Sequence, residues 1–163
     1  MTTTTRLKLT IGQALSQQFS EAFAKLCDDT SISIRDRYAV GRVARNIEQA
    51  ASDYEMQRAK IIREVGEPLL PMLKRQLAGA KDEKQVEHLT KRIADLETSP
   101  GKGEQDFGVD RDNKEQFGKY LKMVNELLAV EFDIFLDHKV AVGDGSKLSA
   151  NDLLALDAIV EVK

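Results

Sequence analysis

The stretch 34–65 contains no proline and a single glycine, Gly41. Its apolar side chains recur at steps of four and three around one gap, as on one face of an α-helix: Val40, Ala44, Ile47, Ala51, Tyr54, Ile61 and Val65. Gly66 and Pro68 follow, and both residue types are typical just beyond a helix end. At about 1.5 Å per residue such a helix is roughly 48 Å long, whereas a compact chain of this size has a radius of gyration of about 15 Å. We therefore expect an elongated bundle around one long helix.

The segment before the long helix predicts a strand followed by a helix. Residues 6–10 alternate polar and apolar side chains, which favours a short strand. Thr10 and Gln13 have the spacing of a capping box, which starts a helix. Apolar positions then continue to Leu26, and the polar run 28–30 ends that helix.

The segment 69–98 predicts either an antiparallel helical hairpin or a bent helix, because two apolar stripes flank Gly79. The run 99–103, Ser-Pro-Gly-Lys-Gly, is the clearest break in the chain. A fourth helix is predicted over 113–129, with Asp112 as its N-cap. Its expected inward residues are Phe117, Tyr120, Leu121, Val124, Leu127 and Leu128.

The last part of the chain predicts short strands and one short helix. Residues 130–136 alternate as in a half-buried strand, and 140–142 predicts a second strand or a turn. Ser149 and Asp152 form another capping box, and 159–162 predicts an edge strand.

These patterns predict an α+β fold, predominantly α, with a small C-terminal β element. We expect a single domain over 1–163, with a flexible tail at 1–5. A helical hairpin insertion with a polar loop occupies 68–112, and a small β/helix element occupies 130–163.

Composition argues against several classes of protein. The formal net charge is -3, whereas dedicated nucleic-acid binders are usually strongly basic, so a nucleic-acid partner is not expected. No apolar run reaches the length of a membrane span, and the threonine-rich start does not have the pattern of a secretory signal.

Candidate catalytic and metal-binding residues are sparse. The only histidines, His88 and His138, lack partners at zinc-ligand spacing, and both are expected on the solvated surface. Cys27 lies beside two aspartates that would raise its pKa, and we interpret it as a small buried hydrophobe. No catalytic residue, metal ligand or cofactor site is therefore predicted, and the chain is not expected to be an enzyme.

Two further sets of charged residues have structural interpretations. Glu131 and Asp133 fall on the polar face of a predicted strand, where their charge would keep an edge strand from pairing. Arg58 falls within the apolar stripe of the long helix, so its head group either reaches solvent or pairs with an acid on the fourth helix such as Glu126.

The most specific surface feature is a face of the long helix formed by Arg35, Tyr38, Arg42 and Arg45. At 100° per residue these side chains fall within an arc of about 80°, nearly opposite the apolar stripe. Arginine and tyrosine suit contact with phosphate or with an acidic protein partner. The alternative is a solvated helix face, partly neutralised by neighbouring acids.

Two blocks of the sequence resemble a group of short tailed-bacteriophage proteins of unknown function. The first ends at Glu67 and is similar to that group's long helix, with a tyrosine followed by basic and apolar positions and a closing Gly-Glu. The second contains FGKYLKMVNELLAVEFDI and LSANDLLALDAIVEV, within 116–162. The segment Pro68–Asp112 departs from the group, whose members pass quickly from the Gly-Glu to the last long helix.

The resemblance implies a non-enzymatic bacteriophage protein, either a virion component or a factor for head or tail assembly, that acts through protein–protein contacts. Its location would be the virion or the host cytoplasm, its partner a phage or host protein, and homo-oligomerisation is expected. The alternative is a small intracellular effector that binds a host protein or a nucleotide. DNA binding through the arginine face is a third hypothesis. The resemblance implies no catalytic residues.

Overall fold

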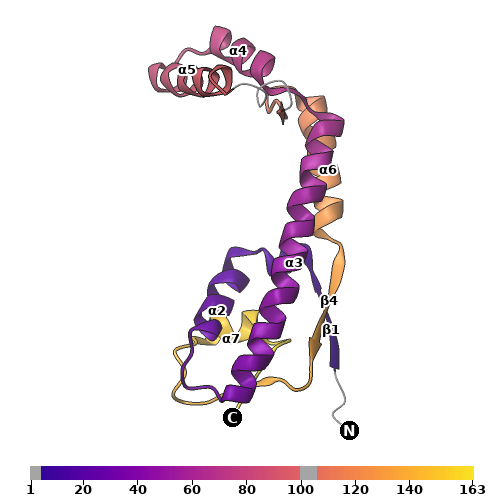
Figure 1. Ribbon diagram of the computed structural model, residues 1–163, viewed down its shortest axis with the longest axis vertical. Helices are drawn as coiled ribbons and strands as arrows, with labels where there is room; N and C mark the ends of the chain where they lie inside the picture. Colours follow the sequence, from indigo (N-terminus) through magenta and orange to yellow (C-terminus); the bar gives the residue numbers. More distant parts are fainter. Residues whose placement is uncertain (1–4, 100–105) are drawn as a thin grey trace. The chain divides into compact units, whose positions relative to one another are not determined.

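The computed structural model describes residues 5–99 and 106–163 (Figure 1). The described part is mostly helical, with short strands, which confirms the α+β, predominantly α, fold class. Of the predicted flexible tail 1–5, residues 1–4 lie outside the described part, and Thr5 is already the first residue of a strand. Of the predicted break at 99–103, only Ser99 lies within it.

The elements pack into two compact units. Unit 1 comprises the chain up to Glu55 together with Glu126–Lys163, and unit 2 comprises Met56–Asn125. The expectation of a single domain over 1–163 stays a prediction.

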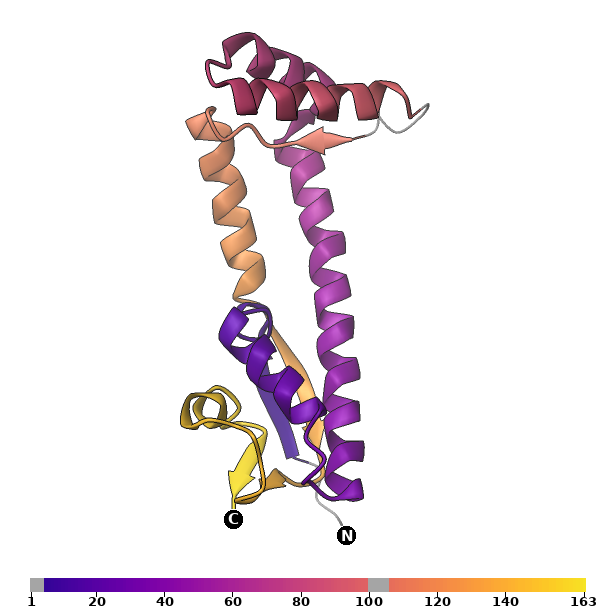
Figure 2. The ribbon, with the colours of Figure 1, turned by 90° about the vertical axis from the view of Figure 1, so that its left-hand side faces the viewer.

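In unit 1, strand β1 (Thr5–Thr10) pairs antiparallel with β4 (Glu131–Leu136), and the two run side by side in Figures 1 and 2. Both strands were expected from their alternation of polar and apolar residues, and both are confirmed. Leu7 lies opposite Ile134 in the register. Because side chains alternate across a strand, one face of the ribbon is apolar and packs into the core of unit 1.

The other face of the ribbon carries two ion pairs. Arg6 bonds to Asp133, and Lys8 Nζ lies 2.9 Å from Glu131 Oε2. The prediction that Glu131 and Asp133 keep an edge strand from pairing is therefore wrong. These carboxylates face the basic residues of the strand that pairs with theirs.

The predicted capping box at Thr10 is confirmed and starts helix α1 (Ile11–Ala14). The Gln13 N–H donates to Thr10 Oγ1 at 3.1 Å, and the Thr10 N–H donates to Gln13 Oε1 at 2.9 Å. Two helix-start amides are thereby satisfied reciprocally.

The single helix expected to continue to Leu26 is broken, and a second helix, α2 (Gln17–Cys27), begins after Ser16. Ser16 Oγ accepts a hydrogen bond from the Phe19 N–H at 3.3 Å and so caps the new helix. Leu15, in the expected apolar stripe, lies at the break and is 37% exposed.

The C-terminal part of unit 1 contains β5 (Val140–Val142) and β6 (Val160–Val162), which pair in parallel. Parallel strands need a crossover between them, and helix α7 (Ala150–Ala155) lies in that connection. Its predicted capping box is confirmed, since Ser149 Oγ accepts from the Asp152 N–H at 3.2 Å. The small C-terminal strands thus match the expectation.

Helix α3 (Ile34–Val65) is continuous over the predicted range and contributes residues to both units. In unit 1 its buried residues Ala39, Val40 and Val43 belong to the core. Half-buried Ile47 packs against the same core. Other core members come from α2, β4, β5 and the chain around α7: Leu26, Ile134, Leu136, Val140, Leu156 and Ile159.

In unit 2, α3 ends at the predicted Gly66, whose N–H donates to Ile62 O at 2.8 Å. Strand β2 (Glu67–Pro68) pairs antiparallel with β3 (Phe107–Gly108). A Cβ at Gly66 would overlap the carbonyl oxygens of Ile62 and Gly108. Only glycine fits where the helix end and the small ribbon approach so closely.

The predicted helical hairpin is formed by α4 (Leu69–Gly79) and α5 (Glu83–Glu97), which lie side by side in Figure 1. The two helices share a small core of buried Met72, Leu73, Leu89 and Ile93. The insertion 68–112 therefore has a hydrophobic core of its own.

The fourth predicted helix is α6 (Lys114–Leu128). Its N-terminal side-chain cap is Asn113, whose Oδ1 accepts from the Gln116 N–H at 3.2 Å, so the assignment of Asp112 as the cap is wrong. Val124 is buried as expected, whereas Leu121 is 42% exposed.

Candidate functional site

The four residues Arg35, Tyr38, Arg42 and Arg45, called here the arginine face, lie near the start of α3 within unit 1. Arg35 and Arg45 are exposed, and Tyr38 is 66% exposed. Ile34, the first residue of the helix, is 84% exposed. Large apolar and aromatic side chains are thus presented to solvent beside arginines.

Two members of the arginine face make contacts within the chain. Arg42 Nη1 lies 3.0 Å from Asp137 Oδ2, beyond the end of β4, and Arg42 is half-buried. Arg45 Nε donates to Gly41 O at 3.4 Å, one turn back in the helix. Tyr38, Arg42, Arg45 and Asn46 line one shallow surface hollow. The structure therefore brings three of the four predicted residues together around one depression and commits Arg42 partly to an internal ion pair.

Beneath the arginine face, Asp36 is buried at the start of α3 and joins three segments of unit 1. Ser33 Oγ donates to its Oδ2 at 2.6 Å, and His138 Nε2 lies 2.9 Å from its Oδ1. The Ala141 backbone also donates to this carboxylate. Burial raises the pKa of Asp36, but the hydrogen bonds from Ser33 and His138 outweigh that effect and leave the pKa below its usual value.

This cluster contains serine, histidine and aspartate, but its geometry is not that of a nucleophilic triad. In a triad the histidine lies between the other two and takes the serine proton. Here Asp36 is central, and both Ser33 and His138 donate to it. His138 Nδ1 is buried without a hydrogen-bond partner among the described residues. The prediction that His138 is merely a solvated surface histidine is wrong, because its ring links the β4–β5 connection to the start of α3.

Other carboxylates in unit 1 hold loops in place. Asp29 Oδ1 accepts from the Ser31 N–H at 2.8 Å, and its Oδ2 accepts from Ser146 Oγ at 2.5 Å. Lys25 Nζ lies 2.8 Å from Asp152 Oδ2, which joins α2 to α7. The Lys25 hydrogen bond, together with donors from Ser149, lowers the pKa of Asp152 to about 2.

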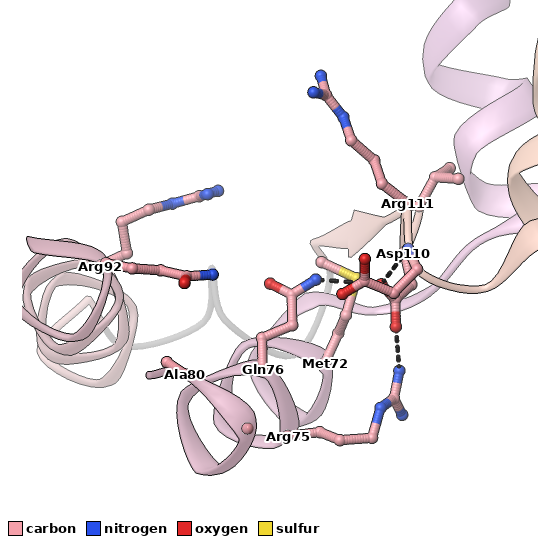
Figure 3. A pocket seen from close by; sticks show the side chains of 11 residues that line it. Met72, Arg75, Gln76, Ala80, Arg92, Asp110 and Arg111 are labelled. Carbon is pink, nitrogen blue, oxygen red and sulfur yellow. Dashed lines mark hydrogen bonds and ion pairs between the residues drawn. The ribbon is translucent and has the colours of Figure 1, made fainter. Parts of the chain in front are cut away.

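A second polar network lies in unit 2, around Arg75 of α4 (Figure 3). Arg75 Nη2 lies 2.6 Å from Glu67 Oε1 and 2.9 Å from Asp110 Oδ2. Gln76 Nε2 donates to Asp110 Oδ1 at 3.2 Å. The hydrogen bond from Arg75 lowers the pKa of Asp110, although burial opposes it. These bonds hold the segment before α6 against α4.

Beside this network is a polar hollow of about 600 Å³ between α4, α5 and the segment 109–112. We call it the hairpin hollow. Figure 3 shows Arg92 of α5 and Arg111 extending into the same open space from different sides. No local sequence pattern singles out these arginines, because they are far apart in the chain and the hollow exists only once α5 has folded beside residues 109–112.

Cys27 is exposed, so its interpretation as a buried hydrophobe is wrong. Desolvation by the surrounding atoms raises the pKa of its thiol, and the charges of Asp28 and Glu48 add to the effect. The expected rise in the pKa of Cys27 is therefore confirmed in direction, and the thiolate fraction at neutral pH is small.

Arg58 contacts α6 through Tyr120, with Nε donating to the phenol oxygen at 3.0 Å. His88 is exposed, as expected.

Among residues 5–99 and 106–163, no group of three or more histidine, cysteine or acidic side chains is placed to hold a metal ion. No helix in that part of the chain combines the length and the apolar character needed to cross a bilayer.

Comparison with known proteins gives no match: no family model, no curated protein and no solved structure is similar to this chain.

Proposed function

We propose that this chain is a non-enzymatic bacteriophage structural or assembly protein, and that it docks onto a partner protein through the arginine face. The observation that most supports this proposal is that Tyr38 is exposed beside Arg42 and Arg45 on one helix. Tyrosine and arginine are enriched among the residues that dominate binding energy at protein interfaces.

The support beneath the face favours a preformed docking surface. Asp36 points into unit 1 and is fixed by Ser33 and His138. Ala39, Val40 and Val43 are buried in the core on the same turns of α3. A helix anchored on one side loses little conformational entropy when its other side binds a partner.

The charge of the face indicates the chemistry of its partner. In a symmetric dimer that used this patch on both copies, Arg35, Arg42 and Arg45 would face their own equivalents. Such like-charge contacts are unfavourable. The proposed partner surface is therefore acidic, on a phage or host protein, and any homo-oligomer would pair this face with a different, acidic surface of the next copy.

The resemblance to short tailed-phage proteins supplies the phage context of the proposal. The first block that carries it lies on α3. The second covers most of α6 and β4, and all of α7 and β6. The arginine face lies in the first block, whereas the α4–α5 hairpin lies in the departing segment 68–112.

Mass spectrometry of gradient-purified phage particles tests the role directly. A structural protein is expected at stoichiometric copy number, and an assembly factor in precursor particles. Absence from both, with production early in infection, would contradict the proposal and favour the intracellular effector.

Two substitutions test the surface. Tyr38→Ala combined with Arg45→Ala should leave the melting temperature unchanged but reduce incorporation into particles. The matched control is Met56→Ala combined with Arg63→Ala, which also removes an exposed apolar side chain and an exposed arginine from α3. Equal incorporation of the two double variants would exclude the arginine face as the docking surface.

A further inference from the structure

We infer that the hairpin hollow is a binding site for a small phosphate-bearing molecule, held between Arg92 and Arg111. This site lies within unit 2 and is independent of the arginine face in unit 1. It is also a different activity from docking onto a protein, so either proposal can fail without the other.

The size and chemistry of the hollow suit a compact polar ligand. Its volume of about 600 Å³ lies within the range of small-molecule sites. Its lining includes three arginines, Arg75, Arg92 and Arg111, together with the amides of Gln76 and Gln85. Most sites for apolar ligands are lined by hydrophobic and aromatic side chains. The donor-rich lining selects instead for a ligand with several acceptor oxygens.

The three arginines differ in whether their guanidinium N–H groups already bind acceptors within the chain. Arg75 is bound by Glu67 and Asp110. The two oxygens of Asp110 are in turn occupied by Arg75, by Gln76 and by a backbone amide. Arg92 and Arg111 make no hydrogen bond or ion pair within the described part of the chain. Among the described residues that line the hollow, their guanidinium groups are therefore the positive charges without an internal partner.

Arg111 is held in a turn whose backbone is fixed on both sides. The Asp110 N–H donates to Gln116 Oε1 at 2.8 Å, and the Asp112 N–H donates to Asp110 Oδ1 at 3.1 Å. The Asn113 N–H also donates a hydrogen bond to Asp110 O at 3.2 Å. Because Asp110 is itself anchored by Arg75, the position from which Arg111 extends is set before any ligand binds. Such preorganisation reduces the entropic cost of binding.

The arrangement of the two free arginines favours phosphate over carboxylate. Arg92 and Arg111 approach from different elements and different sides (Figure 3). A carboxylate presents two oxygens in one plane, and one guanidinium fork satisfies both. A phosphate has additional oxygens outside that plane, so it can accept from two guanidinium groups at once. It also carries more charge than a single carboxylate.

Asp112 also lines the hollow, and its charge opposes an anionic ligand. The negative charge of Asp112 therefore allows a test of whether the ligand is an anion or a cation. Replacing Asp112 with asparagine should tighten the binding of an anion and weaken the binding of a cation.

The test is isothermal titration calorimetry of the full chain with pyrophosphate, inorganic phosphate and acetate, at low ionic strength. We expect pyrophosphate to bind more tightly than phosphate, and both more tightly than acetate, which carries a single carboxylate. Arg92→Gln and Arg111→Gln should each weaken pyrophosphate binding about tenfold or more, the size of a lost charge-assisted hydrogen bond. Asp112→Asn should strengthen it.

Arg63→Gln is the matched control, since it removes an exposed arginine of unit 2 that does not line the hollow. All substituted residues are exposed, so circular dichroism melts should match those of the native chain. The inference is overturned if pyrophosphate does not bind, or if Arg63→Gln weakens binding as much as Arg92→Gln. It is equally overturned if acetate binds as tightly as pyrophosphate, or if Asp112→Asn weakens binding.

Discussion

Asp36 and His138 are 102 positions apart in the sequence, yet the histidine Nε2 lies 2.9 Å from the aspartate Oδ1. Their contact joins the first turn of α3 to the connection between β4 and β5. Asp36 also accepts a hydrogen bond from Ser33 Oγ, so the residue just before α3 and a residue of the β4–β5 connection share one carboxylate.

Replacing Asp36 with alanine should lower the free energy of unfolding by about 1–3 kcal/mol, because Ser33 and the half-buried His138 lose their shared acceptor. Urea denaturation at neutral pH measures this. Asp53→Ala, on the exposed side of the same helix, should change stability by no more than about 0.5 kcal/mol. Equal effects of the two substitutions would show that the Asp36 contacts contribute nothing.

Ile47→Asp should unfold the protein or disrupt its assembly. Ile47 packs against the core of unit 1, and a carboxylate there would be desolvated without a partner. Gln57→Asp places the same charge on an exposed position of α3 and should be tolerated. If Ile47→Asp left the melting temperature and the sedimentation coefficient unchanged, the assignment of Ile47 to the packed side of α3 would be wrong.

Gly66→Ala should be strongly destabilising, because the added Cβ would overlap two backbone oxygens that cannot move independently of α3 and β3. Gly41→Ala is the contrasting control. Gly41 lies inside α3 with no atom within 4 Å of an added Cβ, so alanine should stabilise the helix by up to about 1 kcal/mol. Thermal melts of both variants should therefore shift in opposite directions, and an unchanged or raised melting temperature for Gly66→Ala would contradict the close approach at Gly66.

The Lys25–Asp152 pair should make part of the stability depend on pH in acid. The folded-state pKa of Asp152 is about 2, below its ordinary value of 3.8. The unfolded chain therefore binds the proton more readily, so this contribution is complete above about pH 4 and is lost as the pH falls toward 2. Asp152→Asn should be less stable than the native chain at about pH 6, and the difference should shrink at about pH 3. Urea denaturation at the two pH values checks this, and a difference that grew in acid would contradict it.

Local patterns predicted the helices and strands well where a single stretch of sequence determines them. The bounds of α3 follow from a proline-free run and a glycine stop at Gly66. The break before α2 was missed because the apolar spacing continues through it, although Ser16 is a residue type that commonly caps a helix. Asp112 and Asn113 are both good caps, and their order in the chain does not show which of them starts α6.

Contacts between segments that are distant in the sequence could not be predicted from local patterns. The ion pairs of Glu131 and Asp133 depend on the register of β4 against β1, and the partner of His138 is on another element. Of the arginine face, the helical spacing correctly places Arg35, Tyr38 and Arg45 on an exposed side. It could not show that Arg42 pairs with Asp137, because that aspartate comes close only in the folded chain.

The pairing of β1 with β4 sets an order for events during synthesis on the ribosome. β1 emerges before β4, whose synthesis is complete only when translation reaches Leu136. Until then Leu7 and Leu9 lack the strand that pairs with theirs. Unit 2 is one contiguous segment, Met56–Asn125, and can form its local contacts earlier. Unit 1 is completed only after β6 has emerged, because β6 follows the other elements of the unit in the sequence.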